Sequence, residues 1–170
     1  TKGICHGNKI DIIDTQSMPH SMGMFYATFT QLLGYKPDND EWKVMAMSAE
    51  NVDSTEIENR LLSTIILLDN GRFELDQKYY TGALVDQPNL YSEELLYLLG
   101  TSKDNLLSTN QDYLWQCKVA RAMQRVSEQV IWHILNDLYE KTKTSNLVLS
   151  GGFFMNSVIN GKVSDNTKFK

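Results

Sequence analysis

The longest periodic stretch of the sequence constrains the fold more than any other feature. Over residues 111–143, apolar side chains recur every three or four positions, as Val119, Met123, Val126, Val130, Ile134 and Leu138. This spacing is typical of a long helix that buries one stripe of its surface. The apolar run at 147–149 follows and has the pattern of a short buried strand. We therefore predict an α/β fold in which the long helix packs on a sheet that includes residues 147–149.

Turn and cap residues divide the remaining sequence into shorter elements. Asn70-Gly71 is a strong signal for a tight turn, and Ser21, Ser54 and Ser92 each stand where a helix cap is expected. The predicted elements are a strand or hairpin arm at 9–14, helices at 22–33, 42–49, 55–68 and 93–99, a strand at 72–75, and a further helix that ends near 160.

Composition narrows the class of protein. A chain of 170 residues has room for one domain with a hydrophobic core, and 42% hydrophobic with 22% charged residues is ordinary for a globular protein. A formal net charge of -5 argues against a broad nucleic-acid surface. No apolar run approaches the roughly 20 residues of a membrane span. Cys5 and Cys117 lie far apart without metal-type spacing, which favours a reducing compartment, so we expect a cytoplasmic protein.

The segment Ser150-Gly151-Gly152, followed by Asn156, is the strongest local candidate for a binding site. Two adjacent glycines let a ligand approach the backbone closely, and the N-terminus of the following helix offers unpaired N–H groups to an anion. We expect Asn156 to lie one turn into that helix and to aim its amide at the same place. The alternative is a strand-to-helix turn that needs glycine for its conformation alone.

A second candidate site is the start of the helix at 22–33. Gly23 in a first helical turn costs roughly 1 kcal/mol, which suggests close approach of a ligand or another backbone. His20 and Ser21 stand beside it, although a lone histidine is more often a cap or surface residue. Lys43 is placed to neutralise a phosphate, although an isolated lysine is usually solvated. Neither a serine-hydrolase elbow nor a phosphate-binding lysine loop is present.

Read in order, these segments resemble the O-carbamoyltransferase family of nodulation-factor and antibiotic-tailoring enzymes. The matching residues are PHSMGMFY at 19–26, FTQ at 29–31, LGY at 33–35, EWKVMAM at 41–47, NLVLSGGF at 146–153, Asn156, and NGK at 160–162. Ala122, Gln124 and Glu128 also stand at positions where the family often has the same residues. The blocks occur in the family's order and span most of the chain.

The resemblance implies an actin-like domain of the sugar kinase, heat-shock chaperone and actin superfamily. It also implies a transferase that makes carbamoyl-adenylate from carbamoyl phosphate and ATP and passes the carbamoyl group to an acceptor hydroxyl. By that resemblance, Gly151, Gly152 and Asn156 contact the adenylate. His20, Ser21 and Gly23 line the same cleft, and Lys43 lies near it.

Departures from the family pattern affect what this chain can do. The family's metal-binding histidines precede the PHS block and its metal-binding aspartate follows the NGK block, and residues 1–170 contain neither. We therefore expect a partial domain that is inactive alone, with a divalent metal in the full-length enzyme only and no catalytic or metal-binding residue assigned here.

The implied partners are a small-molecule hydroxyl acceptor and the remainder of the same polypeptide, without nucleic acid or membrane, and a homodimer is left open. The alternatives are a degenerate, non-catalytic scaffold and a kinase-like ATPase.

Overall fold

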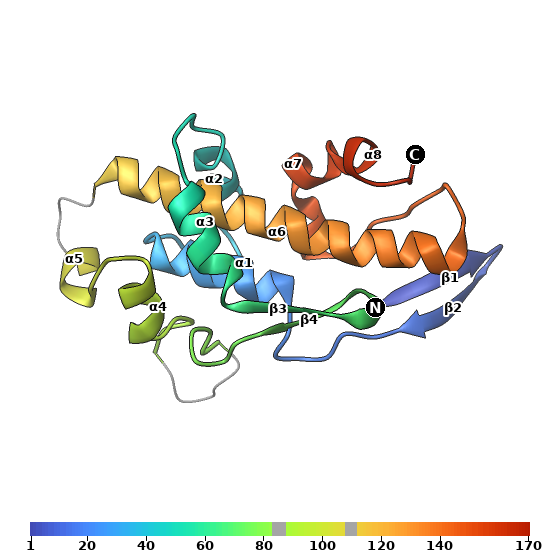
Figure 1. The fold of residues 1–170 in the computed structure, drawn as a ribbon, viewed down its shortest axis with the longest axis horizontal. Helices are drawn as coiled ribbons and strands as arrows, with labels where there is room; N and C mark the ends of the chain where they lie inside the picture. Colours follow the sequence, from blue (N-terminus) through green and yellow to red (C-terminus); the bar gives the residue numbers. More distant parts are fainter. Residues whose placement is uncertain (83–87, 108–111) are drawn as a thin grey trace.

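The longest element of the computed structural model is the helix α6, Tyr113–Thr142, which runs the length of the molecule (Figure 1). The structure describes residues 1–82, 88–107 and 112–170. Asp112 caps α6 by accepting from the Leu114 N–H at 2.9 Å, which satisfies one of the free donors of the first turn. The predicted long helix is confirmed, and Gln111, where we expected it to begin, lies outside the described residues.

Most other elements are short. In chain order the structure has β1 Lys2–His6, β2 Lys9–Asp14, α1 Met22–Leu32, α2 Glu41–Met47, α3 Thr55–Leu62, β3 Ile65–Leu68, η1 Asp69–Gly71, β4 Arg72–Leu75, α4 Glu93–Leu98, α5 Lys103–Leu107, then α6, η2 Gly152–Met155, α7 Ser157–Asn160 and α8 Val163–Asn166. Among the described residues, none of the helices has the length and apolar character that crossing a bilayer requires.

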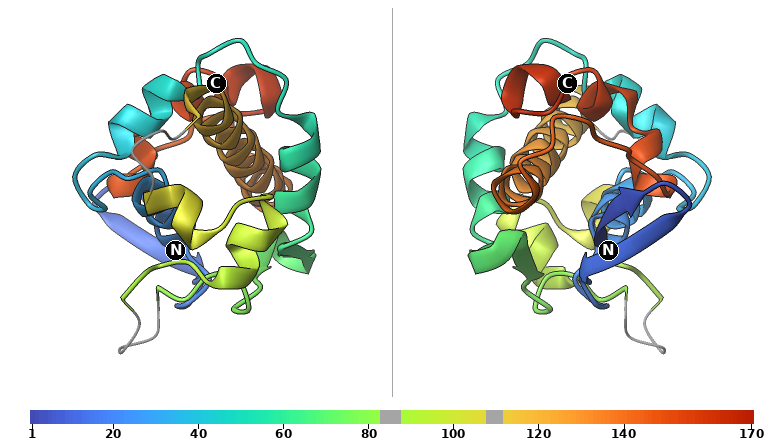
Figure 2. Two further views of the ribbon diagram at one scale, coloured as in Figure 1. Left: turned by 90° about the vertical axis from the view of Figure 1, so that its left-hand side faces the viewer. Right: turned by 90° about the vertical axis from the view of Figure 1, so that its right-hand side faces the viewer.

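The shorter helices pack around α6. Figure 2, which looks along α6 from both ends, shows α1, α2, α3 and α7 arranged around it. Val119, Met123 and Val126 of the predicted stripe are fully buried, against core residues such as Phe25 and Leu61. Further along the stripe, Ile134 and Leu138 are only half-buried. The sequence pattern therefore identified the buried face, but the cover over that face is uneven.

The described strands form two antiparallel pairs, β1 with β2 and β3 with β4. Asn70 and Gly71 join β3 to β4 with φ values of 62° and 61°, which is the left-handed backbone that a tight hairpin turn needs. The predicted class, a mixed α/β fold, is thus observed in the form of helices and two small sheets.

The predicted strand at 147–149 is wrong. Leu147 and Leu149 pack against the core while Val148 is 82% exposed, so the side chains alternate as in a strand. However, the backbone groups of residues 147–150 find no hydrogen-bond partner in the part of the chain that the structure describes. The apolar pattern produced an extended segment, but a strand also needs a neighbour.

The predicted helix at 55–68 is also partly wrong, because α3 ends at Leu62 and β3 follows. The Thr64 hydroxyl donates to the Leu61 carbonyl at 2.7 Å, and the Thr64 carbonyl accepts from the Asp76 N–H at 2.9 Å, so the chain leaves the helix there. Ile65 and the residues after it then pair with β4. Pairing between strands overrides the helical spacing of these apolar side chains.

Candidate functional site

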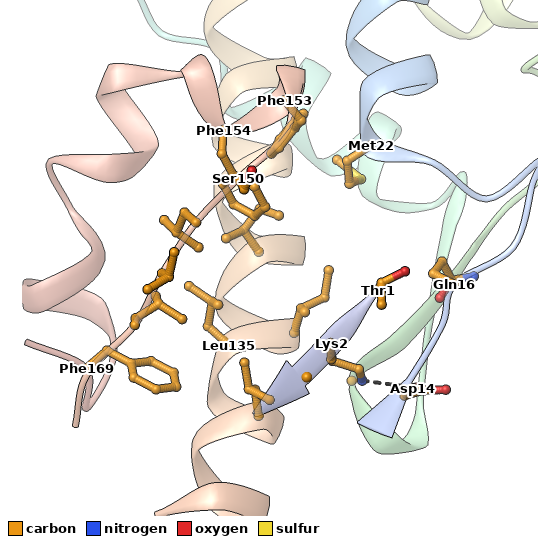
Figure 3. Close-up of a pocket in the computed structure, with 18 of the residues that line it drawn as sticks. Thr1, Lys2, Asp14, Gln16, Met22, Leu135, Ser150, Phe153, Phe154 and Phe169 are labelled. Carbon is orange, nitrogen blue, oxygen red and sulfur yellow. Dashed lines mark ion pairs between the residues drawn. The ribbon is translucent and has the colours of Figure 1, made fainter. Parts of the chain in front are cut away.

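A cavity of about 650 Å³ lies over the C-terminal half of α6 (Figure 3). Its walls are β1 on one side and residues 146–150 on the other, with the start of α1 and the phenylalanines Phe153 and Phe154 closing one end. In Figure 3, Leu135 of α6 lies between the Ser150 wall and the Thr1–Lys2 wall. The volume falls within the range of small-molecule sites.

The cavity brings together two of the sequence blocks singled out above. His20, Ser21 and Gly23 from the start of α1 share its lining with Ser150, which is distant in sequence. Lys43, Gly151, Gly152 and Asn156 are not part of that lining. The structure thus joins the two blocks at Ser150, with the glycine pair directly after it.

Hydrogen bonds hold the start of α1 in place. The Ser21 hydroxyl caps α1 by accepting from the Met24 N–H at 3.4 Å, as predicted for a cap. His20 Nδ1 accepts from the Leu75 N–H at 3.1 Å, which ties this histidine to β4. A ring nitrogen that accepts carries no proton, so a neutral His20 has its proton on Nε2. This Nε2–H has no acceptor among the described residues.

The two glycines of the turn differ in what the fold requires of them. Gly151 has φ 104° and ψ 163°, a backbone conformation that is nearly restricted to glycine. Gly152 begins η2 without a left-handed φ, and a β-carbon placed on it would meet nothing within 4 Å. Gly23 is similar, since its β-carbon would meet only the Ser21 hydroxyl, at 3.5 Å. Neither backbone strain nor crowding explains glycine at 152 or 23.

Asn156 occupies a different position from the one predicted. It lies between η2 and α7, and its Oδ1 accepts from the Ile159 N–H at 3.0 Å, so Asn156 is the N-cap of α7 rather than a residue one turn inside a helix. Its Nδ2 donates to Gln124 Oε1 at 2.9 Å, and the residue is 7% exposed. The amide is therefore engaged in the protein interior.

Gln124 and Glu128 of α6 extend this buried polar network. Tyr26 donates to Gln124 Oε1 at 3.0 Å, and Gln124 Nε2 donates to Glu128 Oε1 at 3.3 Å. Lys162 donates to both carboxylate oxygens of Glu128, at 2.7 and 2.9 Å. Burial raises the pKa of Tyr26 above its ordinary value, so its hydroxyl stays a donor. Tyr26 and Lys162 were not identified from the sequence as members of this network. The sequence signal for the network was the polar pair Gln124 and Glu128, four residues apart on a helix with an apolar stripe.

Lys43 lies on α2, away from the cavity lining. Its ammonium pairs with Asp40 at 2.9 Å and lies 5.7 and 5.6 Å from the ring centroids of Tyr35 and Trp42. The hydrogen bond from Lys43 lowers the pKa of Asp40. Asp40 and the two aromatic rings therefore hold the Lys43 ammonium beside α2, away from the cavity.

A charged cluster fastens the β1–β2 hairpin beside the cavity. Arg72 donates to both carboxylate oxygens of Asp14, at 3.1 and 2.5 Å, and Lys2 pairs with Asp14 at 3.2 Å and Asp137 at 3.3 Å. The Arg72 guanidinium, helped by Lys2, holds the pKa of Asp14 well below its usual range. Each carboxylate faces a cation, so this cluster has the character of a structural clamp.

The residues present do not fit the metal that the family resemblance implies. Within residues 1–82, 88–107 and 112–170, no three His, Cys, Asp or Glu side chains come together as potential ligands. A tightly held transition metal needs about four converging ligands. We therefore derive no step through a metal from this chain.

Residues 4–170 match the family model described as carbamoyltransferase N-terminus. Because this match covers almost the whole sequence, the chain belongs to that family. The motifs at 19–26 and 146–153, which frame the cavity, both lie inside the matched region. Family membership confirms the carbamoyltransferase resemblance at that level.

Curated relatives come from two organisms and are much longer. An uncharacterized protein of Synechocystis sp. is 28% identical over 153 residues, which cover 89% of this chain and 24% of that protein. Two uncharacterized proteins of Methanocaldococcus jannaschii are 29% and 27% identical, over 95% and 88% of this chain and 29% and 22% of their own lengths. The chain thus spans about a quarter of the length of the curated relatives it matches.

Proposed function

We propose that this chain is the nucleotide-binding part of an ATP-dependent O-carbamoyltransferase. The full-length protein makes carbamoyl-adenylate from carbamoyl phosphate and ATP and transfers the carbamoyl group to a small-molecule hydroxyl. Family membership supports the carbamoyl chemistry. The structural observation that carries the proposal is that the start of α1 and the Ser150 turn meet at one end of the cavity over α6.

The glycine pair is the centre of the proposed site. Gly152 is not required by conformation or packing, and the open space beside it leaves room for a ligand to approach the backbone. The Gly151 N–H has no partner among the described residues and is free to donate to an anion. Such fixed backbone donors stabilise the negative charge of an adenylate leaving group without reorganisation.

The start of α1 supplies the opposite wall of this site. His20 presents its Nε2–H as a fixed donor, because Nδ1 is occupied by β4. Gly23 leaves room beside the Ser21 cap. We assign these three residues to the binding of the nucleotide rather than to proton transfer.

Asn156 and Lys43 differ in how the contacts of their side chains fit the proposed site. The Asn156 amide is already satisfied inside the protein, so we propose that it holds the turn in position for the adenylate. Lys43 is the least supported member, because it is paired with Asp40 outside the cavity lining.

Three further expectations belong to this proposal. The chain is part of an actin-like domain, it acts in the cytoplasm, and alone it has no transferase activity. A divalent metal is expected only in the full-length enzyme, where its ligands would come from outside the residues that the structure describes. The competing function is a degenerate, non-catalytic scaffold of the same family, which would bind neither ATP nor carbamoyl phosphate.

The test is calorimetric binding of a non-hydrolysable ATP analogue to the full-length protein, together with a carbamoyl-transfer assay. Gly152→Val should weaken binding at least about tenfold, which is about 1.4 kcal/mol, with an unchanged circular dichroism spectrum. Met155→Val is the matched control, since Met155 lies in the same η2 turn and is 81% exposed. Unchanged affinity in Gly152→Val would show that the turn does not contact the nucleotide, and no binding by the wild type would favour the scaffold.

A further inference from the structure

The two long walls of the cavity are both unpaired backbone edges. β1 bonds to β2 along one side only, and no strand among the described residues pairs with its other side. On the opposite wall, the backbone N–H and C=O groups of residues 147–150 have no hydrogen-bond partner in the described parts of the chain. An unpaired strand edge is a ready template for pairing with another strand, so two such edges facing one cavity can hold a strand between them.

The residues that line the cavity indicate that β1 and residues 146–150 face it with their backbone edges rather than with one side-chain face. Successive residues of a strand point to opposite faces, so contact with one face involves every second residue. Here the lining includes the consecutive residues 1–5 and the consecutive residues 146–150. An edge, with its backbone groups directed along the sheet, gives such an unbroken run. The cavity therefore lies in the plane of a sheet rather than above it.

The floor of the cavity has the chemistry of a surface beneath a sheet. It is formed by Ile131, Ile134, Leu135 and Leu138 on one stripe of α6. Leu147 and Leu149 turn toward the core and Val148 away from it, which is the alternation of a strand lying on that helix. An occupant that satisfies both edges and this floor needs backbone donors and acceptors on two sides and apolar side chains facing α6.

We propose that this cavity is the seat of a β-strand contributed by another part of the same full-length polypeptide. The strand lies between β1 and residues 147–150 and joins them into one sheet over α6. The matched regions make up only 24%, 29% and 22% of the relatives, so a full-length polypeptide of similar size has ample additional chain to supply it. This also explains why residues 147–149 have the side-chain pattern of a strand without a partner. The strand fills the length of the cavity beside α6, so the proposed nucleotide site is confined to the end where the start of α1 meets the Ser150 turn, and failure of one proposal leaves the other standing.

The proposal specifies the character of the inserted strand. Its side chains alternate, with apolar residues on the side that meets Leu135 and its neighbours on α6. Its backbone pairs on both sides, so proline is excluded from its interior. The Ser150 turn then follows directly on the end of a paired strand, which is where ligands bind in open α/β sheets.

Amide-resolved hydrogen exchange on the full-length protein tests this seat. In residues 147–150, every second amide should exchange at least about 100-fold more slowly than its neighbours. In β1, the amides that do not bond to β2 should be protected to a similar degree as those that do. Uniformly fast exchange along both edges would overturn the proposal. Protection that appears only when nucleotide is added would instead identify a ligand pocket, and protection lost on dilution would identify a second copy of the chain. Either of these also overturns it.

Proline substitution provides an independent check. If residues 147–150 pair along one edge, only one of the Val148 and Leu149 amides is hydrogen-bonded. Proline at that residue should raise the exchange rate of the remaining protected amide in the segment by at least about tenfold, whereas proline at the other residue should not. Val148→Ala and Leu149→Ala keep the N–H group and are the matched controls. Equal effects of the two prolines, after comparison with their alanine controls, would contradict pairing along a single edge.

Discussion

The two halves of α6 carry the same apolar stripe but lie in different environments. In the N-terminal half, Met123 and Val126 are completely buried. In the C-terminal half, Ile134 and Leu138 are half-buried and line the cavity. Since the periodic pattern is continuous, the difference comes from what covers each half. The core closes around the first half, which we call the packed half. The second half, which we call the open half, keeps Ile131 and Leu135 buried but leaves part of Ile134 and Leu138 exposed.

Polar groups follow the same division. The packed half encloses Gln124 and Glu128 in a network, and no buried side-chain polar atom of the described residues lacks a partner. Beside the open half, the backbone of residues 147–150 has no partner in the same described residues. The comparison shows that the helical core around the packed half has all its contacts, whereas the backbone edge beside the open half lacks a pairing strand among the described residues.

The largest expected difference between the halves is in core truncation. Met123→Ala should destabilise the protein by about 2–5 kcal/mol, because it leaves a cavity in a closed core. Leu138→Ala should cost about 1 kcal/mol in the 170-residue chain, because part of its surface is already in water. Urea unfolding of both variants measures this. Equal losses would mean that the cavity is closed in solution.

A smaller loss is expected from the buried polar network. Gln124→Leu leaves the Tyr26 hydroxyl and the Asn156 amide without their partner and should cost about 1–3 kcal/mol. Gln129→Leu is the control on the same helix, since Gln129 makes an exposed bond of 2.7 Å to Glu58, and it should change stability by less than about 0.5 kcal/mol. Thermal unfolding compares the two. A Gln124→Leu variant as stable as the wild type would show that the network does not stabilise this half.

The clamp beside the open half should make stability depend on pH. The pKa of Asp14 is lowered in the folded state, so its contribution is present above the ordinary aspartate value near 3.9 and is lost as pH falls toward the folded value. Asp14→Asn should cost about 1.5 kcal/mol at pH 7 and should flatten the fall in Tm below about pH 4. Parallel acid-dependent profiles for the wild type and Asp14→Asn would contradict a role for this carboxylate.

The smallest effect is expected at Lys43, which belongs to neither half of the helix stripe. Its pair with Asp40 lies at the surface, where ion pairs contribute little to stability, so Lys43→Ala should unfold almost as the wild type does. Nucleotide affinity of the full-length variant should change less than about threefold, in contrast to Gly152→Val. A tenfold loss of affinity would place Lys43 at the phosphates after all.

The sequence by itself determined the elements whose signals are local. The helix α6, the Asn70-Gly71 turn and the caps by Ser21 and Ser92 appear where predicted, because each depends on bonds within a few neighbouring residues. It also identified the two blocks that share the cavity. Before α3, Ser54 stands at the cap position, but the Asp53 carboxylate accepts the Thr55 N–H.

Tertiary structure decided every feature that depends on a distant partner. The apolar residues at 65–68 had helical spacing, yet they pair with β4 across the hairpin. Residues 147–149 had the pattern of a strand, yet they stay extended without a ladder, because a strand exists only where another backbone edge reaches it. Asn156 lay in a predicted binding motif, yet its amide turns inward to Gln124, a partner 32 residues away that only the folded chain brings to it. Residue spacing sets local conformation, and only the packed chain settles which groups find partners.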